Sequence, residues 1–402
     1  MRRPVSLLTC LWLGTACSYY DASLLGPKGS VDAGQDVTEE VGPDGSQEAA
    51  ADVQEPDTQV TDAQDEESGQ DASESGTCGS ARPPEPPATS AGGGSVEFVV
   101  AVKQIDFGDG AGNPKDIGYD LDARCTCQGQ GNACLREAWA TADVCDGPLG
   151  RDNAAGALLS KLTPLLTGFG SEDWSQGATE GDWSILLRVR GYNGTPDDDQ
   201  VRLDWFVPHD FWVDKGDDSI QPAWDGNDAW PIRETSVVDP DAGAQSLEEP
   251  KFYDPHAYVT GGMLVASFPE SAFQVSDKYM LDFVGSFITA RVVETTGGWE
   301  LQDGLLASRW KTASILGQLS RVVILGLPVC TNHPTYEGLK SQICSYTDIY
   351  SGVGTPTTPC DSISAGMTFE AKPARLGPVL PQASEPEVCL PAVDPAGDSC
   401  GS

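Results

Sequence analysis

Beyond residue 95 the chain alternates between apolar and polar positions in short runs, and this pattern predicts β-strands. A β-branched run at residues 96–102 opens this part of the chain. Residues 184–191 and 201–207 alternate as half-buried strands do. An Asn-Gly pair, with Pro and Asp close behind it, lies between these two runs and is typical of a turn. We therefore expect residues 185–207 to form a β-hairpin.

Three more strands and three helices follow from the same patterning. The strands are expected at residues 258–268, 280–294 and 299–306, and the short connection between the last two favours antiparallel pairing. Leucines spaced three or four positions apart predict a helix over residues 152–166, with Asp152 as its N-cap. The other helices are expected at residues 311–323 and 335–344.

Strands outnumber helices in this part of the chain, and the fold class follows from that. We expect a mainly β domain over residues 96–402, built as an antiparallel β-sandwich of the jelly-roll type with a few peripheral helices. The C-terminal portion is rich in proline and glycine, and we expect disulfides to order it where packing does not. Its cysteines are Cys330, Cys344, Cys360, Cys389 and Cys400.

Residues 17–95 differ from the rest in composition. They consist largely of Asp, Glu, Gln, Ser, Ala, Gly and Pro, with few large apolar side chains. Such a segment cannot bury enough apolar surface to offset the conformational entropy lost on ordering. It is predicted to be a disordered acidic tether in front of the β-rich domain.

The whole chain is strongly acidic, with 61 acidic and 24 basic residues and a formal net charge of −37. Nucleic acids and anionic lipid surfaces attract basic patches, so both are excluded as expected partners. Divalent cations and basic ligands fit this charge better. No apolar run after the N-terminal segment is long enough to predict a membrane-spanning helix.

The N-terminus has the features of an export signal. Arg2 and Arg3 precede the apolar residues 5–13, and small residues lead up to Cys17. This stretch resembles a bacterial lipoprotein signal, which implies that residues 1–16 are a signal peptide removed before Cys17 and that the Cys17 sulfur carries lipid. Gly14 stands where lipoproteins usually have leucine, and it also suits an ordinary secretory signal. A freely secreted protein is therefore the alternative.

The layout as a whole resembles an uncharacterised class of exported bacterial lipoproteins with an acidic tether and a cysteine-containing β-rich domain. In that class a serine after the lipid-bearing cysteine usually accompanies sorting to the outer membrane, and Ser18 occupies this position. The resemblance implies an outer-membrane lipoprotein, attached to the membrane through the lipid on Cys17. It implies a location and no activity.

The cysteine count favours disulfides. Of twelve cysteines, Cys10 belongs to the signal peptide and Cys17 to the lipid site, which leaves an even number of ten for an oxidising compartment. Zinc is the competing interpretation, because four cysteines cluster in one short stretch. A C-x-C pair without a nearby histidine fits structural zinc poorly. The clustered residues are Cys125, Cys127, Cys134 and Cys145.

An acidic, glycine-rich loop over residues 106–122 is the best metal-site candidate. Glycines let the backbone turn tightly, and carboxylates with carbonyls suit Ca²⁺, which takes 6–8 oxygen ligands. The EF-hand pattern is not met, and a solvated acidic loop is the alternative. Asp152 and Asn153 are expected to add oxygens from elsewhere. The proposed ligands are Asp106, Asp109, Asp120 and Asp122, with Asp116 also in the loop.

Nucleophilic catalysis has little support in the sequence. No H-E-x-x-H motif occurs, and the G-x-S-x-G spacing occurs only at residues 397–401. Residues 397–402 resemble the run around a serine-protease nucleophile only superficially, and they lack the glycine that follows the serine there. The three histidines, His209, His256 and His333, are too scattered to suggest a metal set.

Two segments rich in Trp and Asp, residues 204–214 and 224–230, allow three interpretations: packing of the core and loops, glycan binding, or a two-carboxylate glycosidase. The carboxylates considered for such an enzyme are Asp204, Asp210 and Asp225. We expect a membrane-tethered surface module that binds a glycan or a protein partner, with Ca²⁺ as its one candidate cofactor. The alternative is an extracellular carboxylate-dependent hydrolase acting on polysaccharide.

Overall fold

The computed structural model describes residues 78–89, 92–110, 112–166, 168–239, 246–275, 279–382 and 388–401. All of them belong to one compact unit, Ala72–Ser402. The predicted signal peptide, Cys17, Ser18 and the predicted tether up to residue 77 lie outside the described residues. None of the helices described is long and apolar enough to cross a bilayer.

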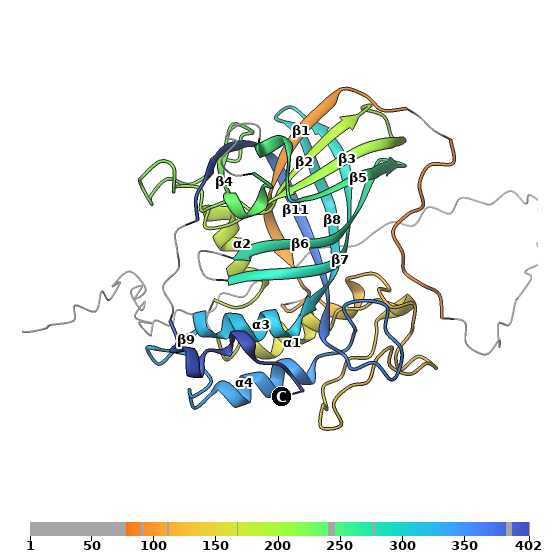
Figure 1. The fold of residues 1–402 in the computed structure, drawn as a ribbon. Coiled ribbons are helices and arrows are strands. Elements are labelled where there is room, and N and C mark those ends of the chain that lie inside the picture. The colour runs from red at the N-terminus through yellow and green to blue at the C-terminus, as the bar shows by residue number, and fades with distance from the viewer. Residues whose placement is uncertain are drawn as a thin grey trace, which may run out of the picture. The chain divides into compact units, whose positions relative to one another are not determined.

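Eight antiparallel strands form a closed β-barrel (Figure 1). Each strand pairs with the next one around the barrel, and the last strand pairs with the first. In order, the barrel strands are β1 (Val96–Asp106), β2 (Leu186–Tyr192), β3 (Asp198–Phe206), β5 (Phe252–Thr260), β6 (Met263–Val275), β7 (Tyr279–Thr295), β8 (Gly298–Lys311) and β11 (Ser362–Leu380).

The predicted β-sandwich is therefore wrong, although the chain is mainly β. Strand β1 is paired on both sides: Val99 is opposite Arg188 in β2 and opposite Ala374 in β11. An open sandwich would leave strand edges that this pairing removes. The closing strand β11 contains Gly366, Pro373 and two further breakers. Patterning therefore did not predict it as a strand, and the closure was missed with it.

The hairpin expected over residues 185–207 is confirmed as β2 and β3. The single strand expected over residues 258–268 is wrong, because Gly261 and Gly262 have left-handed φ values of 56° and 80° and turn the chain back. β5 and β6 pair across that turn. In the part of the chain that the structure describes, three short strands lie outside the barrel circuit: β4 (Ala229–Arg233), parallel to β11, and β9 (Val323–Ile324) with β10 (Leu327–Pro328).

Four α-helices accompany the barrel in the described part of the chain: α1 (Ala154–Leu162), α2 (Ser171–Glu180), α3 (Thr312–Gln318) and α4 (Tyr336–Ser345). Figure 1 shows α1, α3 and α4 gathered at one end of the barrel. Asn153 caps α1, since its side chain accepts a 3.0 Å hydrogen bond from the Gly156 amide. The N-cap predicted at Asp152 is thus one residue early, and α2 was not predicted.

Short 3₁₀ turns also occur among the described residues. They span Pro114–Asp116, Pro148–Gly150, Glu234–Ser236, Leu319–Arg321, Pro391–Val393 and Pro395–Gly397.

Aromatic side chains fill the core. Phe273 stacks on Phe283 with ring centroids 5.1 Å apart, and Trp205 donates a 2.8 Å hydrogen bond to the Ala272 carbonyl. Burying each such side chain contributes about 1.5–3 kcal/mol. Trp205 and Trp230 are completely buried, so both belong to the packed interior of the domain and neither is available to stack on a sugar.

All ten cysteines among the described residues form disulfides, as the even count predicts. The zinc hypothesis is wrong, because only two of the four clustered cysteines pair with each other and the other two are bonded to distant partners. The pairs are Cys78–Cys125, Cys127–Cys145, Cys134–Cys360, Cys330–Cys389 and Cys344–Cys400.

Candidate functional site

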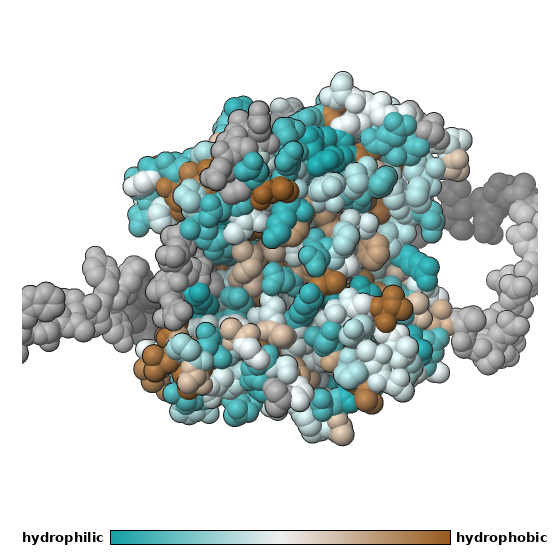
Figure 2. All heavy atoms as spheres, viewed as in Figure 1, coloured by the Kyte–Doolittle hydropathy of each residue, from teal (hydrophilic) through white to brown (hydrophobic). Residues whose placement is uncertain are grey.

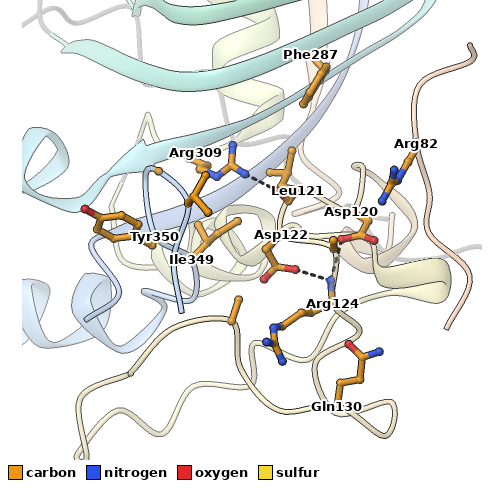
Figure 3. A pocket seen from close by; sticks show the side chains of 15 residues that line it. Arg82, Asp120, Leu121, Asp122, Arg124, Gln130, Phe287, Arg309, Ile349 and Tyr350 are labelled. Atoms are coloured by element: carbon orange, nitrogen blue, oxygen red, sulfur yellow. Dashed lines mark hydrogen bonds between the residues drawn. The ribbon is translucent and has the colours of Figure 1, made fainter. Parts of the chain in front are cut away.

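A pocket of about 730 Å³ lies where the loops after β1 meet β7, β8 and the loop after α4 (Figure 3). Its volume falls within the range of about 300–1,000 Å³ that is common for small-ligand sites. Residues from five separate stretches of the chain line it. The main lining residues are Arg82, Asp120, Leu121, Asp122, Arg124, Gln130, Phe287, Arg309, Ile349 and Tyr350.

Disulfides join the loop segments of the pocket wall. Cys78–Cys125 links the segment that carries Arg82 to the segment of residues 120–133. Cys134–Cys360 links the latter to the loop that begins at Ile349. Backbone hydrogen bonds between the same segments, such as Leu135 N to Thr358 O at 2.7 Å, add to these links. The wall is therefore preorganised, which lowers the entropy lost when a ligand binds.

The pocket has an apolar floor. Leu121 and Ile349 belong to one hydrophobic cluster with Ala307 of β8, and Phe287 of β7 packs against that cluster. Ile349 is 2% exposed, and Phe287 keeps part of its ring accessible. A ligand with an apolar face can therefore contact the floor mainly through Phe287.

The walls around this floor are polar. The Arg124 amide donates hydrogen bonds to Asp122 at 2.9 Å and to Asp120 at 3.2 Å, which fixes the tight turn of this loop. Arg309 reaches in from β8 and donates a hydrogen bond to the Leu121 carbonyl. In Figure 3 the guanidinium of Arg82 is directed toward the carboxylate of Asp120. Guanidinium groups, which donate hydrogen bonds, and carboxylates, which accept them, thus surround one cavity.

A buried carboxyl lies behind the wall. Asp152 is 2% exposed and accepts a 2.7 Å hydrogen bond from the Leu121 amide. Burial raises the pKa of Asp152 well above its ordinary value, and the neighbouring charges of Asp122 and Asp146 raise it further. Burial also raises the pKa of Asp122, with the charge of Asp120 adding to it. Burial and the crowding of acidic groups therefore favour the neutral form of these carboxyls.

Three of these carboxylates could hold a cation. One oxygen from each of Asp120, Asp122 and Asp152 lies within 4.8 Å of the others. Among the described residues, these three form the group of acidic side chains whose spacing could hold a metal ion. Carboxylate oxygens suit Ca²⁺, and a bound cation would favour the ionised form of every carboxyl in the group. Arg309 faces the same cluster, and its charge partly offsets that of the carboxylates.

Two further carboxyls surround this group. Burial raises the pKa of Asp146 and of Asp348 to about 7. Asp348 accepts hydrogen bonds from the amide and the hydroxyl of Ser364 at 2.8 and 2.6 Å. The cluster is therefore partly protonated near neutral pH.

The four ligands predicted for Ca²⁺ lie in two places. Asp120 and Asp122 lie together. Asp152, which was expected to add an oxygen from outside the loop, lies with them. Asp109 accepts a 3.1 Å hydrogen bond from the Ser171 amide at the start of α2. Asp106 accepts a 2.7 Å hydrogen bond from the Gly108 amide.

Asp106 lines a different cavity of about 580 Å³, as does Asp116. Asn153 serves as the cap of α1 and accepts a second hydrogen bond, 2.9 Å long, from the Gly366 amide. Asp116 does not belong to the group formed by Asp120, Asp122 and Asp152.

The carboxylates considered for hydrolysis lie outside the pocket. Asp204 is completely buried and forms ion pairs of 2.6–2.8 Å with three arginines, namely Arg188, Arg190 and Arg202. Asp210 lies 3.7 Å from Arg233. Asp225 accepts a hydrogen bond from the Asn227 amide in a surface turn.

The three histidines are equally scattered. His209 contacts the Leu380 carbonyl at 3.2 Å, and His333 is hydrogen bonded to Thr335 at 2.9 Å. His256 lies exposed on β5. None of the three lines the pocket.

Comparison with known proteins found no matching family model, no matching curated protein and no matching solved structure. The chemistry of the pocket is thus the basis for assigning a function.

Arg82 and Arg309 were not predicted as site residues. Arg82 falls in the segment assigned to the tether, yet Cys78 ties this segment to Cys125, and the Ala81 amide donates a 2.7 Å hydrogen bond to the Leu149 carbonyl. A cysteine at position 78, within an otherwise acidic segment, was the one sequence feature that indicated a disulfide between this segment and the β-rich domain. Arg309 lies beyond the end of the strand expected at residues 299–306, and nothing in its local sequence marks it.

Proposed function

We propose that this protein is a membrane-tethered exported lipoprotein whose β-barrel domain binds a saccharide in the pocket beside Asp120 and Asp122. The supporting observation is the combination of a cross-linked wall, an apolar floor and planar polar side chains around one cavity. A pyranose ring has an apolar C–H face and a rim of hydroxyls. Phe287, which is the accessible part of the floor, suits the face, and Asp120, Arg124 and the neighbouring polar groups suit the rim.

The shape of the site favours a glycan over a protein partner. Small-ligand sites are concave, whereas a stable protein interface needs about 800 Å² of surface on each partner. The pocket is a half-open cavity, and three disulfides hold the loops on its rim: Cys78–Cys125, Cys127–Cys145 and Cys134–Cys360. A glycan end or a short branch fits such a cavity.

Binding is tested on a glycan array with the purified exported protein. We expect a defined class of glycan to be retained, and Arg124→Ala to weaken its binding about tenfold or more, since a hydrogen bond to a charged group contributes about 1.5–3 kcal/mol. Arg291→Ala is the matched control, because Arg291 lies exposed on β7 in an ion pair with Asp303. Equal loss in both variants would contradict a role for the pocket.

A polysaccharide hydrolase is the second candidate, and one observation favours it. Oxygens of Asp120 and Asp122 lie within 4.8 Å of each other, close to the separation of about 5 Å that retaining glycosidases use. Burial raises the pKa of Asp122, as a general acid requires. Product analysis separates the two functions: shortened glycans that vanish with Asp122→Asn would establish the enzyme, and intact glycans would establish binding alone.

A further inference from the structure

A small hairpin projects from the domain with an apolar tip. β9 and β10 are joined by Leu325 and Gly326, whose φ values of 54° and 80° are those of a tight two-residue turn. The base of the hairpin is rooted in the core, since Val322 and Val329 are 4% and 0% exposed and are joined by a 2.9 Å backbone hydrogen bond. The tip is therefore held out from a fixed base.

The tip exposes apolar surface. Leu325 is 95% exposed, and Val323 and Leu327 are 63% and 59% exposed. Residues 322–329 contain no charged or polar side chain. Leu390 is also largely exposed, and the adjacent Cys389 is bonded to Cys330 just after the hairpin. In Figure 2 brown, apolar atoms gather at the corner where Figure 1 labels β9.

Folding alone does not account for Leu325. The left-handed region costs a residue with a side chain roughly 1–2 kcal/mol, and this type of turn favours Asn or Asp at the first position. Leu325 bears that strain while leaving nearly all of its apolar surface in water. Such a residue is expected where its side chain is used for binding.

We propose that the β9–β10 hairpin inserts its tip into the surface of a lipid bilayer. A projecting apolar tip fits the interior of a bilayer, whereas two-residue strands offer too few backbone groups to pair firmly with a second copy. The predicted lipid on Cys17 would hold the domain beside such a surface. Insertion by apolar contact needs no basic residues, which agrees with the acidic character of the chain.

The test uses exported protein with Cys17→Ser, so that no acyl chain contributes, and vesicles of phosphatidylcholine without net charge. We expect this protein to float with the vesicles, and Leu325→Asn with Leu327→Ser to lower its partition coefficient by roughly tenfold for each leucine removed. Asparagine tolerates the left-handed turn, so the melting temperature should not fall. Val238→Ser is the control, because Val238 is 64% exposed and lies elsewhere.

Three results would overturn the proposal. They are an absence of vesicle binding by the Cys17→Ser protein, equal binding by the hairpin variant, and a dimer that the hairpin substitutions dissociate. None of these results bears on the pocket, because no hairpin residue lines it. Failure here therefore leaves the proposed saccharide site to its own test.

Discussion

Cys134 is bonded to Cys360, 226 residues further along the chain, and this bond joins two segments of the pocket wall. Replacing both by serine should lower the free energy of unfolding by about 2–5 kcal/mol. It should also weaken saccharide binding, because the loop that starts at Ile349 would lose its fixed distance from Asp122.

The matched control for this pair is Cys330→Ser with Cys389→Ser, since that disulfide lies outside the pocket lining. We expect the control to lose stability in a denaturant titration and to keep its affinity for the saccharide. If both pairs affect affinity equally, the rigidity of the pocket wall is not what matters for binding.

Calcium should stabilise the domain through Asp120, Asp122 and Asp152. At a Ca²⁺ concentration of 100 Kd a site present only in the native state adds about 2.7 kcal/mol to unfolding. Asp120→Asn with Asp122→Asn should abolish that gain, whereas Asp106→Asn, which alters a carboxylate in another cavity, should leave it intact. Mg²⁺ should substitute poorly, because it demands a tighter octahedron.

Thermal unfolding measured against an ionic-strength control checks this prediction. An unchanged melting temperature in millimolar Ca²⁺ would mean that the three carboxylates are merely close together and bind no cation.

Stability should depend on pH through the buried carboxyls. Burial raises the pKa of Asp348 from 3.8 to about 7, so the folded state retains a proton that the unfolded chain releases. The resulting stabilisation is complete below about pH 4 and is lost as the pH rises through 7. Without metal, the free energy of unfolding should therefore fall between about pH 4 and pH 8.

Asp348→Asn checks this assignment, because an amide can accept the hydrogen bond from the Ser364 amide and does not titrate. Denaturant titrations across the pH range should show a decline that is smaller in the variant, by on the order of 2–4 kcal/mol. Parallel curves for the two proteins would show that other groups cause the pH dependence.

Lipidation at Cys17 remains a prediction from the N-terminal sequence. Several acyl chains on Cys17 would anchor the protein firmly, because anchoring that resists washing takes more than one acyl chain. Cys17→Ser should therefore move the protein to the soluble fraction, or leave only a weak, salt-independent association with the membrane through the hairpin. Membrane fractionation followed by mass spectrometry of the N-terminal peptide measures this. An unmodified Cys17 in the wild-type protein would identify an ordinary secretory signal.

The strands could be predicted where side chains alternate and turns are short. β2, β3, β7 and β8 were predicted in this way. Barrel closure could not be predicted, because it depends on β1 meeting β11 from the far end of the chain. Pro373 is tolerated opposite Val100 in this pairing, although proline normally argues against a strand. The turn at Gly261 was missed because apolar residues continue on both sides of it.

The candidate site was predictable only in part. Asp120 and Asp122 lie two residues apart in a loop whose composition suggests a cation site, and Asp152 was considered as an added ligand. Their convergence depends on the hydrogen bond from the Leu121 amide to Asp152, a contact across 31 positions of sequence. Arg309 comes from a barrel strand, so only the closed barrel brings it to the pocket.

The most direct test of the saccharide site is a titration of the glycan selected on the array into the wild-type protein and into Arg124→Ala, followed by calorimetry. The account predicts one site per chain for the wild type, an affinity reduced about tenfold or more in the variant, and recovery of the glycan intact. Binding that Arg124→Ala leaves unchanged, or a domain that retains no glycan at all, would contradict it.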